Sequence, residues 1–106
     1  MVRYGVIGVG AMGREHIENL KHIPGTSVAA ISDPFPESLD RAKVLINGEV
    51  KTFADHRDLL NSGVVDAVII ATPNYTHVDV LKDALATSLH VFIAVSYTHL
   101  TLPTKA

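Results

Sequence analysis

Short apolar runs alternate with amphipathic stretches along most of this 106-residue chain, and no other feature of the sequence limits its fold as strongly. The apolar runs have the length and the β-branched content of buried strands. The stretches between them carry apolar residues at helical spacing. Buried strands that alternate with helices form a parallel sheet covered on both faces, with right-handed crossovers. The sequence therefore predicts an α/β fold, a doubly wound parallel sheet of about five strands.

The boundaries of the elements follow from turn and cap residues. Pro24-Gly25 should end the first helix, Pro36 suits the first turn of the second, and Asp55 suits an N-cap. The expected strands are residues 2–8, 28–32, 50–53, 64–71 and 90–93, and the expected helices are 11–23, 36–46, 55–60 and 78–87. The last helix should bury Val78, Leu81, Ala84 and Leu85.

Composition excludes several classes of function. Hydrophobic content of 47% with 19% charged residues is globular, and a net charge of −2 without a basic cluster disfavours nucleic acid and anionic membranes as partners. There is no cysteine and no apolar stretch of spanning length, so we expect a soluble, cytoplasmic chain without disulfides. No metal site is expected: His16 and His22 do not share a helical face, and these two and His56 suit surface or packing roles.

The stretch "GVIGVGAMGREH" holds Gly8, Gly10 and Gly13 in G-x-G-x-x-G spacing, after an expected strand and at the start of an expected helix. In a dinucleotide-binding Rossmann domain the first glycine allows a tight turn. The second lets the backbone approach a pyrophosphate, and the third lets helix and strand pack closely. The helix N-terminus, at Ala11 and Met12, offers free N–H groups to the phosphates. The motif therefore predicts dinucleotide binding.

Asp33 supplies the acid that such a motif requires, because it lies 20 residues after Gly13 and directly follows "VAAIS". A carboxylate there accepts hydrogen bonds from the adenosine ribose and favours NAD over NADP. The next residues supply no arginine for a 2′-phosphate, and Arg41, the nearest, lies within the expected helix. The alternative is a glycine turn that binds no nucleotide, with Asp33 only capping a helix.

A second loop should complete the site. In a doubly wound sheet the strands before Gly8 and before Thr72 are expected to be neighbours at the topological switch point, so that their ends form two walls of one crevice. Thr72, Pro73 and Asn74 would then lie along the cofactor. The alternative is that Asn74 and Thr76 are only turn and helix-cap residues.

Together "GVIGVGAMGREH", "AAISD" and "DAVIIATPNYTHVDVLKDAL" resemble the cofactor domain of the Gfo/Idh/MocA oxidoreductases over about residues 2 to 93. The resemblance implies NAD(P)-dependent hydride transfer at a hydroxyl carbon of a sugar, inositol or related polyol. It implies a structural or indirect role for His77, rather than a catalytic one, and no catalytic residue within this chain. The cofactor-contact positions that it implies are Gly8, Gly10, Ala11, Met12, Gly13, Asp33, Thr72, Pro73, Asn74 and His77.

The resemblance stops after Ile93. The family continues its fifth strand into an E-K-P motif, whose lysine reaches the substrate, whereas this chain reads Ala94, Val95, Ser96. One reading frame of the transposase adapter used in sequencing libraries encodes V-S-Y-T-H-L-T-L-P-T, which matches residues 95–104. We therefore expect residues 1–94 to be an incomplete, truncated Rossmann domain and residues 95–106 to be translated adapter. The family's C-terminal domain, with its substrate pocket and acid/base histidine, would be missing.

Three functions remain open from the sequence. The first is the NAD(P)-binding half of a sugar or polyol oxidoreductase, inactive as this fragment alone. The second is a stand-alone NAD(H) sensor or regulatory module without chemistry. The third is a relative that uses the fold for another reaction, such as biliverdin reduction or glycosidic cleavage through a transient oxidation. The sequence gives neither the substrate nor the oligomeric state, and a homo-oligomeric parent is compatible with it.

Overall fold

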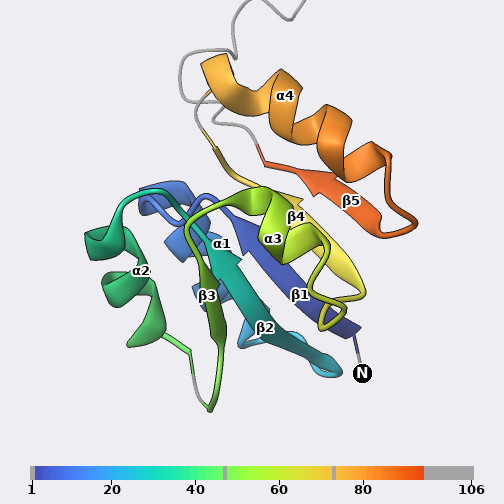
Figure 1. The fold of residues 1–106 in the computed structure, drawn as a ribbon. Coiled ribbons are helices and arrows are strands. Elements are labelled where there is room, and N and C mark those ends of the chain that lie inside the picture. Colours follow the sequence, from blue (N-terminus) through green and yellow to red (C-terminus); the bar gives the residue numbers. More distant parts are fainter. Residues whose placement is uncertain (1, 47, 73, 95–106) are drawn as a thin grey trace, which may run out of the picture.

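The computed structural model describes residues 2–46, 48–72 and 74–94, with the backbone alone for residues 74–77. The expected adapter tail, residues 95–106, and Pro73 lie outside this part. The described chain contains one parallel five-stranded sheet in the order β3-β2-β1-β4-β5, as Figure 1 shows. The strands are β1 (Val2–Ile7), β2 (Thr26–Ser32), β3 (Lys51–Phe53), β4 (Ala67–Ile70) and β5 (His90–Ile93). Five strands and parallel pairing were both predicted, and both are confirmed.

Helices cover both faces of the sheet, which confirms the doubly wound architecture (Figure 1). They are α1 (Ala11–Leu20), α2 (Pro36–Lys43), α3 (His56–Leu60) and α4 (Asn74–Leu85). On one face α1 and α2 pack Ile17 and Ala42 against Val6 and Ile31 of the strands. On the other face α3 and α4 pack against the neighbouring residues of the same strands, including Ile7 and Ala30. Successive side chains of a strand point to opposite faces, so each buried strand contributes to two cores.

Helices α1 and α2 each end three residues earlier than predicted. Helix α1 ends at Leu20, and tighter turns continue to Ile23, whose N–H donates to the Leu20 carbonyl at 3.1 Å. The Thr26 hydroxyl lies within hydrogen-bond distance of the carbonyls of Leu20 and Ile23, which stabilises this early end. Helix α2 ends at Lys43, and Val44, predicted to be helical, is exposed. In both cases the apolar spacing continues beyond the regular helix.

The prediction for α4 was wrong at its start, at its end by two residues, and in part of its buried face. The helix begins at Asn74, four residues before the predicted start at Val78, because its first turn lacks the apolar spacing used to find it. Val80 and Ala84 are buried, whereas Val78 and Leu85 are 60% and 64% exposed. Two overlapping sets of residues satisfy helical spacing here, and contact with the sheet selects the set that contains Val80.

The strand boundaries also differ slightly from those predicted. Strand β4 begins at Ala67 rather than at residue 64, because Asp66 instead pairs with Arg3 at the start of β1. The Asp66 N–H donates to the Arg3 carbonyl at 2.7 Å, and the Arg3 guanidinium and N–H donate to the Asp66 carboxylate. The Arg3 side-chain and backbone hydrogen bonds lower the pKa of Asp66 to about 2. This ion pair fixes the amino-terminal ends of β1 and β4.

Candidate cofactor site

A cavity of about 650 Å³ lies where the carboxyl ends of β1, β2, β3 and β4 come together, and we call it the crevice. Its walls include Gly8 after β1, Asp33 after β2, Asp55 after β3 and Thr72 after β4. Strands β1 and β4 are neighbours, as the sequence predicted. In open α/β sheets ligands bind outside the carboxyl ends of the strands at such a switch point. The volume is also within the range of about 300–1,000 Å³ that is typical of ligand pockets.

Gly8 and Gly13 are required by packing. Gly8 has φ +91°, a conformation that side chains disfavour, and a Cβ there would lie 2.9 Å from the Thr72 nitrogen. A Cβ at Gly13 would overlap the carbonyl oxygen of Gly8, so this residue lets α1 approach the end of β1. The predicted roles of Gly8 in a tight turn and of Gly13 in close packing are confirmed. Gly13 does not itself line the crevice.

Gly10 differs from the other two glycines of the motif. Its φ is −69°, which any residue adopts, and a Cβ built on it would meet nothing within 4 Å. Gly10 is the N-cap of α1, and with Ala11 and Met12 it lines the crevice. The first N–H groups of a helix have no partner within it, so this end of α1 can donate hydrogen bonds to an anion in the crevice. Open space at Gly10 leaves room for that anion.

Asp33 is almost buried and forms two hydrogen bonds with backbone N–H groups. Its Oδ2 accepts from Val9 at 3.0 Å and its Oδ1 accepts from Phe35 at 2.9 Å. Phe35 is the N-cap of α2 and no side chain caps that helix, so Asp33 is not its capping residue. Each carboxylate oxygen retains a lone pair for a further donor. The bond to Val9 fixes the carboxylate beside the glycine loop, at the wall of the crevice.

Thr72 contributes the other wall. Its hydroxyl oxygen is buried and has no hydrogen-bond partner among the described atoms. A buried hydroxyl without a partner is uncommon and calls for an explanation. Pro73 lies outside the described residues. Asn74 and His77 have described positions in the backbone of α4, and their side chains lie outside the described part.

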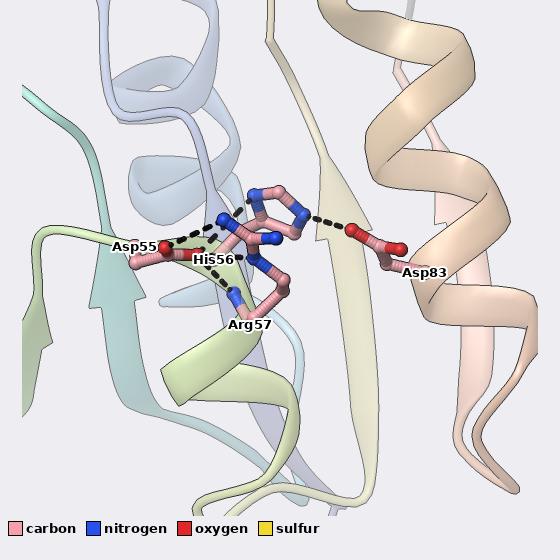
Figure 2. A network of polar contacts seen from close by, with 4 residues as sticks. All are labelled: Asp55, His56, Arg57 and Asp83. Carbon is pink, nitrogen blue, oxygen red and sulfur yellow. Dashed lines mark hydrogen bonds and ion pairs between the residues drawn. The ribbon is translucent and has the colours of Figure 1, made fainter.

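The structure adds polar residues that the sequence did not indicate. Asp55, His56 and Arg57 at the start of α3 line the crevice, as does Ser38 of α2. Figure 2 shows the Arg57 side chain folded back on Asp55, while the His56 ring points towards Asp83 of α4. Asp55 caps α3 as predicted, since its Oδ1 accepts from the Arg57 N–H at 2.8 Å. Three of them could have been found from their place in the sequence, because Asp55, His56 and Arg57 come shortly after the end of β3.

His56 joins two helices. Its Nε2 lies 2.7 Å from Oδ2 of Asp83, and its ring is half-buried between α3 and α4. The packing role predicted for this residue is therefore confirmed. Within the described part of the chain, no group of three or more histidine or acidic residues could hold a metal ion. No helix in the same residues is long and apolar enough to cross a membrane.

Comparison with known proteins decides the family. Residues 2–94 match the Gfo/Idh/MocA family, described as an oxidoreductase family with an NAD-binding Rossmann fold. The chain belongs to this family. This confirms the resemblance predicted from the glycine loop, Asp33 and the Thr72 loop. The Rossmann fold of this family binds NAD. The match ends at Ala94, one residue after the point where the sequence motifs stop.

The relatives carry names of different enzyme classes. Inositol 2-dehydrogenase of Arthrobacter sp. is 42% identical over 93 residues, which cover 85% of this chain and 27% of the relative. Glycosyl hydrolase family 109 protein 1 of Shewanella sp. is 36% identical over 103 residues, with 90% and 22% covered. The myo-inositol dehydrogenase of Lactobacillus casei, solved with NAD(H) and myo-inositol, has a TM-score of 0.81 at 33% identity, with 88% and 28% covered. The chain thus spans about a quarter of the length of these relatives.

NAD fits the crevice on three observations from the structure. Space is open at Gly10 beside the N-terminus of α1. The Thr72 hydroxyl is buried without a partner in the described residues. The Asp33 carboxylate is fixed at the crevice wall and retains accepting capacity. Together these residues offer an anion site, a free hydroxyl and a hydrogen-bond acceptor along one cavity.

Proposed function

We propose that this chain is the cofactor-binding domain of an NAD-dependent oxidoreductase that acts on a hydroxyl group of an inositol, sugar or related polyol. The observation that carries the proposal is that Gly10, Asp33 and Thr72 line one crevice at the switch point of the sheet. Similarity to inositol dehydrogenases supports the substrate class. A cytoplasmic location and a homo-oligomeric parent belong to the same proposal.

Each residue would have a separate task in holding the cofactor. The N–H groups at the start of α1 would bind the diphosphate, with Gly10 leaving room for it. Asp33 would accept hydrogen bonds from the adenosine ribose hydroxyls, which favours NAD over NADP. Thr72 would donate to or accept from the cofactor on the opposite wall, together with Pro73, Asn74 and His77. When bound, NAD would supply the hydride acceptor for oxidation of a hydroxyl carbon.

A second candidate reaction is favoured by the similarity to a glycosyl hydrolase family 109 protein. In that case the same cofactor domain would serve cleavage of a glycosidic bond through a transient oxidation. The two candidates share the crevice and differ in the substrate domain. Turnover of NAD separates them, because net oxidation of a polyol accumulates NADH and a transient oxidation regenerates NAD.

The experiment starts from genomic DNA. We propose that residues 95–106 derive from adapter sequence. The genomic locus should therefore encode a different amino-acid sequence after residue 94, and a native stop codon after Ala106 would contradict this. The full-length protein should form NADH with myo-inositol, scyllo-inositol or glucose, and a Gly10→Val variant should not. Residues 1–106 alone should not form NADH above that control. Absence of both NAD binding and turnover in the full-length protein would contradict the proposed function.

A further inference from the structure

The crevice contains a cation as well as the carboxylate of Asp33. Arg57, from the N-terminus of α3, lines the same cavity as Asp33 and Ser38. Among the described residues that line the crevice, it is the only arginine or lysine. The sequence indicated no arginine close to Asp33, because Arg57 is 24 residues further along the chain. The Asp33 N–H donates to the carbonyl of Phe53, the last residue of β3, at 3.0 Å, so the fold brings the segment that follows β3 to the side of the crevice where Asp33 lies.

This guanidinium is already paired with a carboxylate. Nε of Arg57 donates to Oδ1 of Asp55 at 3.2 Å, and Nη2 donates to Oδ2 at 3.1 Å (Figure 2). The Arg57 N–H donates to the same Oδ1 at 2.8 Å, so Asp55 is fixed by the cap of α3 as well as by the side chain. The Arg57 side-chain and backbone hydrogen bonds lower the pKa of Asp55 to about 2, so this carboxylate is ionised at neutral pH.

The surrounding charges do not favour a second anion. The carboxylates of Asp58 and Asp83 also act on Arg57, and Asp33 lies in the same crevice wall. Asp55 takes the Nε–H of Arg57 and one N–H of Nη2 and neutralises the guanidinium, so a phosphate that approached the remaining donors would meet a paired cation beside a carboxylate. It would also meet the negative charge of Asp33. The paired arginine therefore offers a 2′-phosphate little net attraction.

We propose that Asp55 is a selectivity residue, which withholds Arg57 from the 2′-phosphate of NADP and so maintains a preference for NAD. This inference rests on the proposed function, because it requires that the crevice bind the adenosine end of a dinucleotide. Asp55 is then a positioning residue that acts through Arg57. The preference for NAD has two determinants: Asp33, which repels the phosphate, and Asp55, which neutralises the cation that would attract it.

The decisive variant is Asp55→Asn. Asparagine caps helices as well as aspartate does, so α3 is retained while the ionic pair is lost. Dissociation constants of NAD and NADP are measured for the full-length protein by ligand-observed NMR titration, which detects weak binding. The ratio of the NADP constant to the NAD constant should fall by about tenfold or more, the effect of a charge-assisted hydrogen bond. Far-UV circular dichroism checks the fold, and Asp55→Ser, another cap former, is the second variant.

Three further variants make the test specific. Asp55→Asn combined with Arg57→Gln should restore the wild-type ratio, because the gain depends on the released guanidinium. Arg57→Gln alone should not lower the ratio, since it supplies no guanidinium for the phosphate and leaves the Asp55 carboxylate unpaired. Asp66→Asn is the matched control, because it breaks a similar exposed arginine–aspartate pair at the amino-terminal ends of β1 and β4, away from the crevice, and should not change the ratio.

The outcomes separate this inference from the proposed function. If the wild type binds neither dinucleotide, both proposals are wrong. If NAD binds and Asp55→Asn or Asp55→Ser leaves the ratio at its wild-type value, only the role of Asp55 is wrong. The same conclusion follows if Arg57→Gln alone lowers the ratio, or if Asp55→Asn strengthens both dinucleotides equally.

Discussion

Replacing Gly13 with alanine should destabilise the folded chain, whereas the same change at Gly10 should mainly weaken NAD binding. At Gly13 the new methyl group would overlap the Gly8 carbonyl oxygen and lie 2.9 Å from its carbonyl carbon. Both atoms are backbone, so α1 or the glycine loop must shift. Overpacking of this kind costs about 1–3 kcal/mol. The higher helix propensity of alanine offsets about 1 kcal/mol. Near the upper limit of the packing cost, the expected net loss is about 2 kcal/mol.

Gly10→Ala is the matched comparison because the chemical change is identical. Its backbone φ of −69° suits alanine, and no atom lies within 4 Å of the added methyl group. Alanine is a poorer N-cap than glycine, so a loss below about 1 kcal/mol is expected. The methyl group would nevertheless occupy the open space where the diphosphate should approach α1. The two variants therefore separate a packing role from a binding role within one motif.

Urea unfolding followed by far-UV circular dichroism gives the free energy of unfolding, and calorimetric titration of folded protein gives the affinity for NAD. Gly13→Ala should lower the midpoint of unfolding, and Gly10→Ala should lower the affinity with little change in the midpoint. A Gly13→Ala protein as stable as the wild type would refute the packing argument. Wild-type affinity in Gly10→Ala would refute the assignment of the diphosphate to this end of α1.

Three other changes test the fold and the site. Asp33→Ser with an arginine at Pro34 should shift preference from NAD to NADP, since lost hydrogen bonds to the carboxylate cost about 1.5–3 kcal/mol, and equal wild-type affinities for the two cofactors would contradict this. Arg3 lowers the pKa of Asp66 from 3.8 to about 2. The pair therefore stabilises the fold above pH 4 or so, and this stabilisation is lost as the pH falls from about 4 to about 2. Thermal midpoints of wild type and Asp66→Asn should therefore differ at pH 7 and converge near pH 2, and a constant difference would oppose the assignment. Leu59 is fully buried, so Leu59→Ala should lower the free energy of unfolding measured in urea by about 2–5 kcal/mol. A smaller loss would show that the surrounding residues close the cavity.

Local sequence signals predicted the elements that the core requires, and they were less reliable at boundaries. Strand β5 was predicted at its observed bounds because its apolar run coincides with its ladder to β4. Helix α1 was predicted three residues too long, because Ile23 keeps the helical spacing although the helix has ended. Its end depends on Thr26, whose hydroxyl meets carbonyls three and six residues earlier in the chain. Such local bonds from a side chain to the backbone leave no periodic pattern.

In the site, too, residues that belong to a motif were predicted and a residue placed by the fold alone was missed. Gly8, Gly10 and Asp33 were predicted because a motif gives their spacing, and the structure shows them lining one crevice. Arg57 was missed because no motif includes it. Its position depends on β3 lying beside β2, and the prediction used only the ends of β1, β2 and β4. Once the strand order is known, every residue that directly follows a strand becomes a candidate.

The central position of β1 affects how the chain folds during synthesis. This strand is made first, but its two neighbours arrive at different times: β2 begins at Thr26 and β4 only at Ala67. At a synthesis rate of about 5–20 residues per second, one side of β1 stays unpaired for a period on the order of seconds. An open strand edge is a template for pairing with another chain. Crowded nascent chains should therefore aggregate most readily before β4 emerges, and slower translation between the two strands should lengthen that interval.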